Sequence, residues 1–492
     1  MTVGRITEGC GVVSLKGNGG AHVTSICSDS RKVAAGSMFI AVKGFASDGH
    51  DYIASAVQKG ASAIVYEDPK ALDILGEIDT QDVAWIQVES SRHALGIIAS
   101  NFYDCPSAKL TLVGITGTNG KTTTVTLLHR LFTKLGYSCG LLSTIANYVG
   151  SRRFEAVNTT SDPITINSLL NDMVSEGCAY CFMEVSSIGV EQERIAGLKF
   201  KAGIFSNLTH DHLDYHKTFA EYLRCKKMFF DNLPADAFAI TNIDDRNGEV
   251  MVQNTRASVV TYSCRGLADH SCRVLEMSFD GMMLKMDGTE TWCRLTGMYN
   301  AYNLLAIYTT ATVLGGDKDE VLVALSTLGP APGRLENMKG PKDISVIIDY
   351  AHTPDALENV LRTLREIAPD RELVCLFGCG GDRDRTKRPE MGAIAQKFAD
   401  RIIVTSDNSR TEKTSDIMAE IKGGMDISGR AKSLFIEDRE EAIRTAIAVA
   451  GQGATVLLAG KGHETYQIIG TEKRHFDEKE IVERINKEYQ QA

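Results

Sequence analysis

The chain has 492 residues, and at about 150 residues per domain this length predicts about three domains. Its 43% hydrophobic and 24% charged residues are ordinary for a globular protein, and the net charge of −10 argues against general nucleic-acid binding, though not against binding of a nucleotide. The sequence has neither an apolar run of membrane-spanning length nor a signal-peptide pattern in residues 1–18, so we expect a cytoplasmic protein without membrane insertion.

Two turn-rich breaks divide the chain. Short β-like runs at 37–42 and 61–66 are followed by Asp-Cys-Pro-Ser at 104–107, just before a longer apolar segment. A second break, Gly-Pro-Ala-Pro-Gly, covers 329–333. Beyond each break, apolar runs alternate with helix-length segments, which predicts α/β domains with parallel sheets. The predicted domains are 1–106, 107–331 and 332–492.

The most informative stretch begins just after the first break. Residues 110–115 are strand-like, and apolar residues then recur at helical spacing from Val125 until Gly136 supplies a helix stop. Between them lies Gly-Thr-Asn-Gly-Lys-Thr at 117–122, whose backbone N–H groups, lysine and threonine suit phosphates and a magnesium ion. We therefore predict a phosphate-binding loop for a nucleoside triphosphate. Ile115 stands where the usual spacing has glycine, and a plain glycine-rich turn is the alternative.

Polar clusters follow the predicted strands of both later regions. In the middle region Glu184, residues 206–212 and residues 242–245 each come directly after an apolar run. In the last region the same holds for 349–352, 378–385, 407–410 and 460–464. Open α/β sheets bind ligands at the carboxyl ends of their strands. We therefore expect each of these two domains to present one functional edge, and the two edges to enclose a cleft.

Glu184 and His212 are candidate magnesium ligands. The carboxylate suits magnesium well, whereas imidazole suits it less. His210, Asp211, His212 and His216 could instead hold zinc, and a solvated polar loop is the third interpretation.

The cysteines and a second glycine motif are further candidates for functional sites. The twelve cysteines predict free buried thiols, and the single C-x-x-C of Cys178 and Cys181 lacks a second pair at zinc-finger spacing. Gly-Cys-Gly at 378–380 resembles the start of a dinucleotide fingerprint, but Arg383 stands where a glycine is needed, which argues against NAD. The guanidinium-rich loop at 380–388 suits carboxylate or phosphate instead, with a solvated charge run as the alternative.

Together these motifs resemble those of the Mur ligases, the ATP-dependent amide-bond-forming enzymes of bacterial cell-wall precursor synthesis. The phosphate loop, Asn-Leu-Thr at 207–209 with Asp-His-Leu-Asp at 211–214, and Gly333-Arg334 resemble motifs of the whole superfamily, which includes folylpolyglutamate synthetase. Other stretches resemble the branch that adds the third residue of the stem peptide: 29–31, 158–160, 183–187, 349–355, 380–384 and 460–464. The resemblance covers nearly the whole chain.

The resemblance implies a small α/β N-terminal domain for the uridine end of the substrate, a central ATPase domain with a mononucleotide-binding parallel sheet, and a Rossmann-like C-terminal domain for the incoming amino acid. It implies a monomeric ligase that uses ATP, Mg²⁺ and UDP-N-acetylmuramoyl-L-alanyl-D-glutamate.

The resemblance also implies roles for individual residues. ATP would contact Gly117, Thr118, Asn119, Gly120, Lys121, Thr122, Thr123, Asn300, Arg334 and His352. The UDP substrate would contact Ser30, Thr159, Thr160, Ser186, Gln192 and Arg194. The amino acid would contact Arg383, Asp407, Asn408, Arg410, Gly460 and Glu464. The catalytic residues would be Lys121, Glu184, His212 and Lys226, and the metal would be held by Thr122, Glu184, His212 and Lys226 as a carbamate.

The incoming amino acid is predicted to be meso-diaminopimelate rather than L-lysine. Diaminopimelate carries one more carboxylate, which Arg410 can pair, whereas lysine would bring an ammonium towards this guanidinium. Ser409 replaces the usual proline of this motif, and Ile188 replaces the histidine that usually follows Glu-Val-Ser-Ser. The alternatives are a lysine-adding ligase, a ligase like folylpolyglutamate synthetase and a nucleotide-dependent switch without ligase chemistry.

Overall fold

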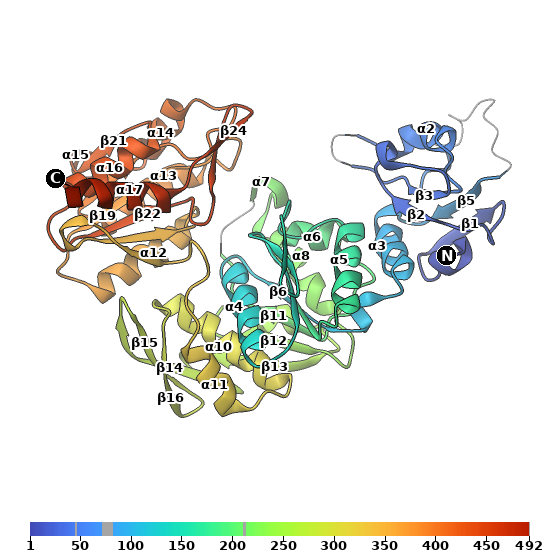
Figure 1. Ribbon diagram of the computed structural model, residues 1–492, viewed down its shortest axis with the longest axis horizontal. Helices are drawn as coiled ribbons and strands as arrows, with labels where there is room; N and C mark the ends of the chain where they lie inside the picture. The colour runs from blue at the N-terminus through green and yellow to red at the C-terminus, as the bar shows by residue number, and fades with distance from the viewer. Residues whose placement is uncertain (45–46, 71–81, 210–212, 492) are drawn as a thin grey trace.

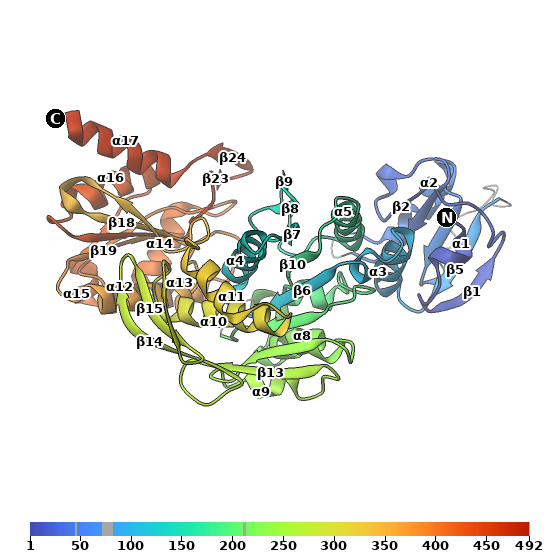
Figure 2. The ribbon, with the colours of Figure 1, turned by 60° about the horizontal axis from the view of Figure 1, so that its bottom comes forward.

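The computed structural model describes residues 1–44, 47–70, 82–209 and 213–491. Three large sheets follow one another along the chain, and with their helices they form three lobes in a row (Figure 1). A two-stranded sheet of β23 and β24 lies in the C-terminal part of the chain. The N-terminal and C-terminal lobes lie at opposite ends of the molecule in both ribbon views (Figure 2). The predicted α/β class with three such regions is confirmed. Among the described residues, each sheet has all its strands within one of the three predicted domains, 1–106, 107–331 or 332–492. The exact domain limits stay predictions.

The N-terminal sheet has five strands in the order β1-β5-β4-β3-β2. Its first strand is antiparallel to β5, and the other neighbours are parallel. Apolar clusters pack on both faces. The elements are α1 (Val3–Ile6), β1 (Val12–Lys16), β2 (Ser25–Cys27), β3 (Ser37–Ile40), α2 (Ile53–Gln58), β4 (Ala63–Tyr66), β5 (Ala84–Val88) and α3 (Ser91–Phe102).

The central sheet has the strand order β16-β15-β14-β13-β12-β11-β6-β10-β7-β8-β9. The strands from β14 to β7 in this order are parallel, and β15 and β16 at one edge and β8 and β9 at the other are added in antiparallel pairs. Helices α4 and α10 cover one face and α5 and α8 the other, which explains the nearly continuous apolar runs of the inner strands. The strands are β6 (Thr111–Thr116), β7 (Cys139–Leu142), β8 (Asn147–Val149), β9 (Arg152–Phe154), β10 (Tyr180–Glu184), β11 (Ala202–Phe205), β12 (Phe238–Asn242), β13 (Ser258–Ser263), β14 (His270–Ser278), β15 (Gly281–Met286) and β16 (Thr289–Cys293). The helices are α4 (Lys121–Lys134), α5 (Pro163–Ser175), α6 (Ser187–Glu191), α7 (Leu213–His216), α8 (Phe219–Asp231), α9 (Gly248–Val252), α10 (Met298–Val313) and α11 (Lys318–Ser326).

The C-terminal sheet has six strands in the order β17-β18-β22-β19-β20-β21, all parallel except β17. Helices α12, α13 and α14 cover one face, and α16 and α17 cover the other. This doubly wound arrangement agrees with the Rossmann-like domain expected from the sequence. The elements are β17 (Glu336–Lys339), β18 (Ser345–Asp349), α12 (Pro354–Ile367), β19 (Leu373–Phe377), α13 (Lys387–Phe398), β20 (Arg401–Val404), α14 (Thr414–Gly423), α15 (Ile427–Ala431), β21 (Ser433–Phe435), α16 (Arg439–Val449), β22 (Thr455–Ala459), β23 (Tyr466–Ile469), β24 (Glu472–His475) and α17 (Glu478–Gln491).

All cysteines are free thiols, as predicted, and most of them are buried. Cys178 and Cys181 lie in the central core and do not belong to any cluster of potential metal ligands among the described residues. Within the described parts of the chain, the search for a helix of sufficient length and hydropathy to cross a lipid bilayer finds none.

Candidate active site

The phosphate loop lies between β6 and α4, where the sequence predicts it, and α4 ends just before Gly136. Gly120 caps the helix with φ 90°, a left-handed conformation that favours glycine. A Cβ there would lie 2.4 Å from Oδ1 of Asn303, so the packing of α10 also requires glycine. Ile115 is fully buried in β6, which explains why an apolar residue stands at this position.

Ser206 and Asn207, which follow β11, form hydrogen bonds with the backbone of the phosphate loop. The Ser206 hydroxyl donates to the carbonyl of Asn119 at 2.7 Å. The Asn207 side chain accepts from the Asn119 N–H at 2.9 Å and donates to the Asn119 carbonyl at 3.1 Å. The Lys121 ammonium donates to the carbonyls of Gly117 and Thr118, both at 2.9 Å. These bonds keep the loop in one conformation.

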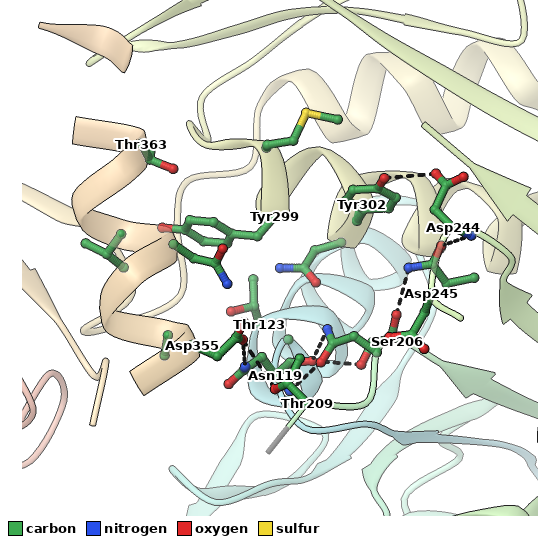
Figure 3. A pocket seen from close by; sticks show the side chains of 18 of the residues that line it. Asn119, Thr123, Ser206, Thr209, Asp244, Asp245, Tyr299, Tyr302, Asp355 and Thr363 are labelled. Atoms are coloured by element: carbon green, nitrogen blue, oxygen red, sulfur yellow. Dashed lines mark hydrogen bonds between the residues drawn. The ribbon is translucent and has the colours of Figure 1, made fainter. Parts of the chain in front are cut away.

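Two cavities flank the loop. The α10 cavity, of about 490 Å³, lies between the ends of β11 and β12, helix α10 and helix α12 (Figure 3). The β10 cavity, of about 510 Å³, lies between the end of β10, residues 158–160 and the C-terminal domain. Asn119, Gly120, Thr123 and Arg334 line both cavities. Each cavity has the volume of a typical small-molecule site.

Aromatic and acidic side chains line the α10 cavity. The Tyr302 hydroxyl donates to Asp244 at 2.9 Å, and Tyr299, one turn earlier on the same helix, points towards α12 (Figure 3). Burial, with the bond to Asp244 adding to it, raises the pKa of Tyr302, so the hydroxyl stays protonated. Aromatic rings next to a carboxylate suit a nucleoside, because the rings can pack against the base and the carboxylate can accept hydrogen bonds from the hydroxyl groups of the sugar.

Asn300, which the resemblance places at the nucleotide, does not line either cavity. It lies one layer behind, where its amide donates to the Thr296 carbonyl at 2.8 Å and its Oδ1 accepts from Asn303 at 3.1 Å. Asn303, one helical turn further on, lines the α10 cavity. The sequence interpretation missed Asn303, although its i, i+3 spacing puts it on the same face of α10.

The β10 cavity collects most of the residues that the resemblance assigns to phosphates, metal and UDP substrate. Glu184 is buried at the end of β10, and its carboxylate accepts from the Thr144 N–H at 2.8 Å. The Thr144 hydroxyl donates to that of Thr159 at 3.0 Å. The predicted residues lining this cavity are Thr118, Asn119, Gly120, Lys121, Thr122, Thr123, Thr159, Thr160, Glu184, Ser186, Arg194, Lys226, Arg334, His352 and Arg383.

Lys226 is buried on α8 and reaches the phosphate loop. Its ammonium donates to the Gly117 carbonyl at 2.8 Å and lies 4.6 Å from the centre of the Tyr222 ring. The local sequence around Lys226 is typical of a surface helix, on which a lysine side chain would be exposed. In the structure this side chain is only 1% exposed. The fold therefore brings Lys226 to the same cavity as Glu184 and Thr122.

Asp355, at the start of α12, joins the C-terminal domain to the phosphate loop. Its Oδ2 accepts from the Asn119 amide at 2.7 Å and from the Thr209 hydroxyl at 3.3 Å (Figure 3). Burial raises the pKa of Asp355, although both of these bonds oppose that shift. The sequence interpretation did not single out Asp355 as a contact between domains.

Replacing Asp355 by alanine is expected to raise the KM for ATP about tenfold. A hydrogen bond to a charged group stabilises by about 1.5–3 kcal/mol, and 1.4 kcal/mol corresponds to a factor of ten. Steady-state kinetics at varied ATP measure the effect. Glu358→Gln, on the next turn of α12 and paired with Arg362, is the matched control and should leave KM unchanged. An unchanged KM in Asp355→Ala would show that this contact does not help to build the nucleotide site.

Arg334 and His352 lie at the junction of the central and C-terminal domains. The Arg334 guanidinium lies 4.7 Å from the centre of the Tyr350 ring. Nδ1 of His352 donates to the Tyr350 carbonyl at 2.8 Å, which fixes the orientation of the ring. Both predicted residues therefore face the β10 cavity from the C-terminal side.

Four of the residues predicted for the amino acid form a buried network at the ends of β20 and β22. Asn408 donates to Glu464 at 2.9 Å, and Lys461 lies 3.2 Å from the same carboxylate. Burial alone would raise the pKa of Asp407, but the nearby Lys461 and Arg439 cations lower it. Gly460 leaves room for Asp407, because a Cβ there would lie 2.9 Å from Oδ2. The sequence interpretation missed the fully buried Lys461, which follows Gly460 directly.

The side chains of two predicted residues, Arg383 and Arg410, lie beside Gly380. A Cβ at Gly380 would lie 3.0 Å from the Arg410 guanidinium and 3.7 Å from the Arg383 side chain. One amino group of Arg410 donates to the Gly381 carbonyl at 2.8 Å, which fixes the side chain. Arg383 is exposed and lines the β10 cavity. A carboxylate in the β10 cavity can therefore reach Arg383 directly, whereas Arg410 does not line that cavity.

Among the described predicted residues, Asn300 and five of those predicted for the amino acid, Asp407, Asn408, Arg410, Gly460 and Glu464, do not line either cavity. Three further predicted residues remain. Ser30 lies in a 3-10 turn (Ser30–Lys32) of the N-terminal domain, where its carbonyl accepts from Lys59 at 2.7 Å. Gln192 orients Arg194 by accepting from Nε at 3.0 Å. His212 falls outside the described residues.

Comparison with known proteins relates all three regions of the chain to one protein family. Three family profiles match: "Mur ligase family, catalytic domain" over residues 22–103, "Mur ligase middle domain" over 115–311 and "Mur ligase, glutamate ligase domain" over 333–462. The UDP-N-acetylmuramoyl-L-alanyl-D-glutamate--2,6-diaminopimelate ligase of Cytophaga hutchinsonii is 53% identical over 475 residues, which are 96% of each chain. The protein of the same name from Bacteroides thetaiotaomicron is 47% identical over 99% of this chain and 100% of its own.

Solved structures give the same picture. A structure of a ligase with that name matches with a TM-score of 0.71 and 30% identity, covering 100% of this chain and 99% of the other. The MurF ligase from Thermotoga maritima in complex with ADP shares the fold at 18% identity, with a TM-score of 0.64 over 96% of this chain and 98% of its own.

Proposed function

The chain belongs to the Mur ligase family, and we propose that it joins meso-diaminopimelate to UDP-N-acetylmuramoyl-L-alanyl-D-glutamate in peptidoglycan precursor synthesis, with conversion of ATP to ADP and phosphate. The observation that carries this proposal is the composition of the β10 cavity. The phosphate loop and Glu184 line it from the central domain, and His352 and Arg383 line it from the C-terminal domain. A phosphoryl donor and an incoming amino acid would thus meet in one space. We further propose that the protein acts as a monomer in the cytoplasm.

The nucleotide would lie across the phosphate loop, with its base in the α10 cavity and its outer phosphates in the β10 cavity. Tyr299, Tyr302 and Asn303 offer the aromatic and amide groups for the base. Lys121 is placed to neutralise the outer phosphates.

The residues near the end of β10 fit a magnesium ion. Glu184 offers a buried carboxylate and Thr122 a hydroxyl, and oxygen donors are the ligands that magnesium prefers. Lys226 would add two oxygens as a carbamate, and His212 is proposed as a further ligand. A bound magnesium ion would neutralise the charge of the phosphate being transferred.

In the proposed reaction the substrate carboxylate attacks the γ-phosphorus of ATP, the bond to the bridging oxygen breaks and ADP leaves. The resulting acyl phosphate is then attacked by the amine of diaminopimelate, which forms the amide, loses a proton and releases phosphate. Lys121 stabilises charge on the phosphoryl group. The contact of Asp355 with Asn119 holds the C-terminal domain against the loop and excludes water from the acyl phosphate.

The UDP end of the substrate would extend to the N-terminal domain. Ser30 is proposed to contact the uridine nucleotide there. Thr159, Thr160, Ser186 and Arg194 would hold the peptide end, because they line the β10 cavity and not the α10 cavity.

Charge at Arg410 favours diaminopimelate over lysine. Asp407, Asn408, Gly460 and Glu464 would surround the amino acid with Arg383, and Arg410 would pair its extra carboxylate. Lysine would leave that guanidinium unpaired and bring an ammonium close to it. A ligase like folylpolyglutamate synthetase has no need of this guanidinium pair, and a nucleotide-dependent switch has no need of either substrate site.

Replacing Arg410 by alanine is expected to lower kcat/KM for diaminopimelate by at least about a hundredfold, since a buried carboxylate loses its partner at a cost of about 3–5 kcal/mol. The assay follows ADP release with UDP-N-acetylmuramoyl-L-alanyl-D-glutamate and a panel of amino acids. Wild type should use diaminopimelate and reject lysine. Arg401→Ala, at the opposite end of β20 and paired with Glu372 at 2.5 Å, is the control and should behave as wild type. Equal use of lysine by wild type would refute the amino-acid assignment, and ADP release without either substrate would refute the ligase.

A further inference from the structure

Three side chains with different metal-binding groups meet behind the β10 cavity. The Glu191 carboxylate, the His216 imidazole and the Cys225 thiol each place one potential ligand atom within 4.8 Å of the other two. They come from three elements, α6, α7 and α8, and His216 and Cys225 are buried. The proposed ligase reaction uses none of the three, so the cluster is independent of it.

The orientation of the imidazole suits a metal ligand. Nε2 of His216 lies 2.8 Å from the Ser187 hydroxyl, and Nδ1 lies 3.8 Å from Oε2 of Glu191. With the proton on Nε2 donated to Ser187, the lone pair of Nδ1 faces the cluster. Metal-binding histidines are typically held in this way by a hydrogen bond from the other ring nitrogen. Oε2 of Glu191 is itself buried and has no hydrogen-bond partner among the described residues.

The distances between the three ligand atoms and their chemical types favour zinc over magnesium. Zinc binds nitrogen, oxygen and thiolate at about 2.0–2.3 Å, so two ligands of a tetrahedral site lie about 3.3–3.6 Å apart. The 3.8 Å between Glu191 and His216 is close to this value, and small rotations of side chains would close the wider distances. Magnesium prefers oxygen ligands only, so a thiol and an imidazole disfavour it.

We propose that Glu191, His216 and Cys225 form a second metal site that binds one zinc-class divalent cation, with water as the fourth ligand. Binding replaces the thiol proton of Cys225, which passes to solvent, and forms the metal–sulfur bond. The thiol's only described hydrogen bond, 4.0 Å long to Glu221, is given up at small cost. The bound cation ties α6, which follows Glu184, to α8, where Lys226 is the next residue after Cys225. The site therefore links two walls of the β10 cavity.

The test is a cobalt titration of the full-length protein after chelator treatment, without nucleotide. Cobalt reports thiolate ligation by a charge-transfer absorption band, which an oxygen-ligand magnesium site does not give. We expect the band to saturate at one equivalent and to vanish when zinc is added. Cys225→Ser should abolish the band, and Glu191→Gln should weaken cobalt binding by at least about tenfold. Cys178→Ser and Cys264→Ser are matched controls that should keep the band, as should Glu184→Gln.

Two outcomes would overturn the proposal: no thiolate band at saturating cobalt, or a band that persists in Cys225→Ser. Circular dichroism and thermal unfolding check that each variant is folded. If Cys225→Ser does not fold, Glu191→Gln provides the test. The Glu191 side chain is 34% exposed and glutamine has nearly the same size, so this variant should fold. An unchanged cobalt affinity in Glu191→Gln would refute the site. The readout does not depend on ligase activity, so a failure here leaves the proposed function standing.

Discussion

Replacing Lys121 by alanine is expected to lower kcat for ADP formation about a hundred- to a thousandfold at saturating ATP. Removal of a single preorganised group that stabilises developing charge has effects of this size. The ammonium is held beside the loop by the carbonyls of Gly117 and Thr118, so the charge stands in place before the phosphoryl group is transferred. Release of ADP, measured in a coupled assay with both substrates saturating, gives kcat directly.

The loss should come from chemistry and not from unfolding. Two part-buried hydrogen bonds disappear in Lys121→Ala, which at about 1 kcal/mol each lowers Tm by only a few degrees. Lys134→Ala, in the last turn of the same helix and exposed, is the matched control and should keep full activity. Normal turnover by a folded Lys121→Ala protein would contradict the assignment of the phosphate loop.

Local signals made the phosphate loop predictable. The strand, the glycines and the helix are consecutive in the sequence, so each can be identified from its own spacing, and Gly136 ends α4 as its position predicts. The polar residues at the ends of β10, β11 and β20 were also predictable, because parallel strands place their carboxyl ends at one edge. The expected cleft between the central and C-terminal domains agrees with the β10 cavity, which both domains line.

Contacts between distant segments could not be predicted in the same way. The bond between Asn119 and Asp355 joins residues 236 positions apart, and no periodicity encodes such a pairing. The burial of Lys226 is also a tertiary effect, because its neighbours on α8 alone resemble those of an exposed lysine. The role of Asn300 at the nucleotide stays a prediction. Asn303, one turn further along α10, lines the α10 cavity because it packs against Gly120, and this contact is not encoded in the local sequence.

The structure also limits what the family resemblance contributes to the C-terminal domain. The resemblance supplies Asp407, Asn408 and Glu464 as contacts for the amino acid, but these side chains already bond to one another or to Lys461. We infer that, besides the contacts with the amino acid proposed above, these bonds fix the loop that presents Arg410. The replacement of proline by Ser409 fits this view, because Ser409 is buried and the network holds the loop in its place.

Replacing Lys226 by alanine is expected to lower kcat at least about a hundredfold, with partial recovery in the presence of short-chain carboxylic acids. As a carbamate Lys226 would carry a negative charge and two oxygens beside Glu184, whereas alanine leaves only a cavity next to the loop carbonyl that the ammonium now contacts. A small carboxylate can enter that cavity and supply the same oxygens. The expected rescue rises with carboxylate concentration and then saturates, as binding to one site requires.

The neighbouring lysine provides the control for this experiment. Lys227 pairs with Asp231 at 2.5 Å on the other side of α8, so Lys227→Ala should keep wild-type turnover and show no response to added carboxylates. Mass spectrometry of the intact protein under native conditions should find the mass of one added carbon dioxide in wild type and in Lys227→Ala, but not in Lys226→Ala. A fully active Lys226→Ala protein, together with an unmodified lysine in wild type, would show that the buried cation only supports the phosphate loop. Loss of activity without any rescue would instead assign Lys226 a role as an ammonium, because that charge is the one feature a carboxylate cannot replace.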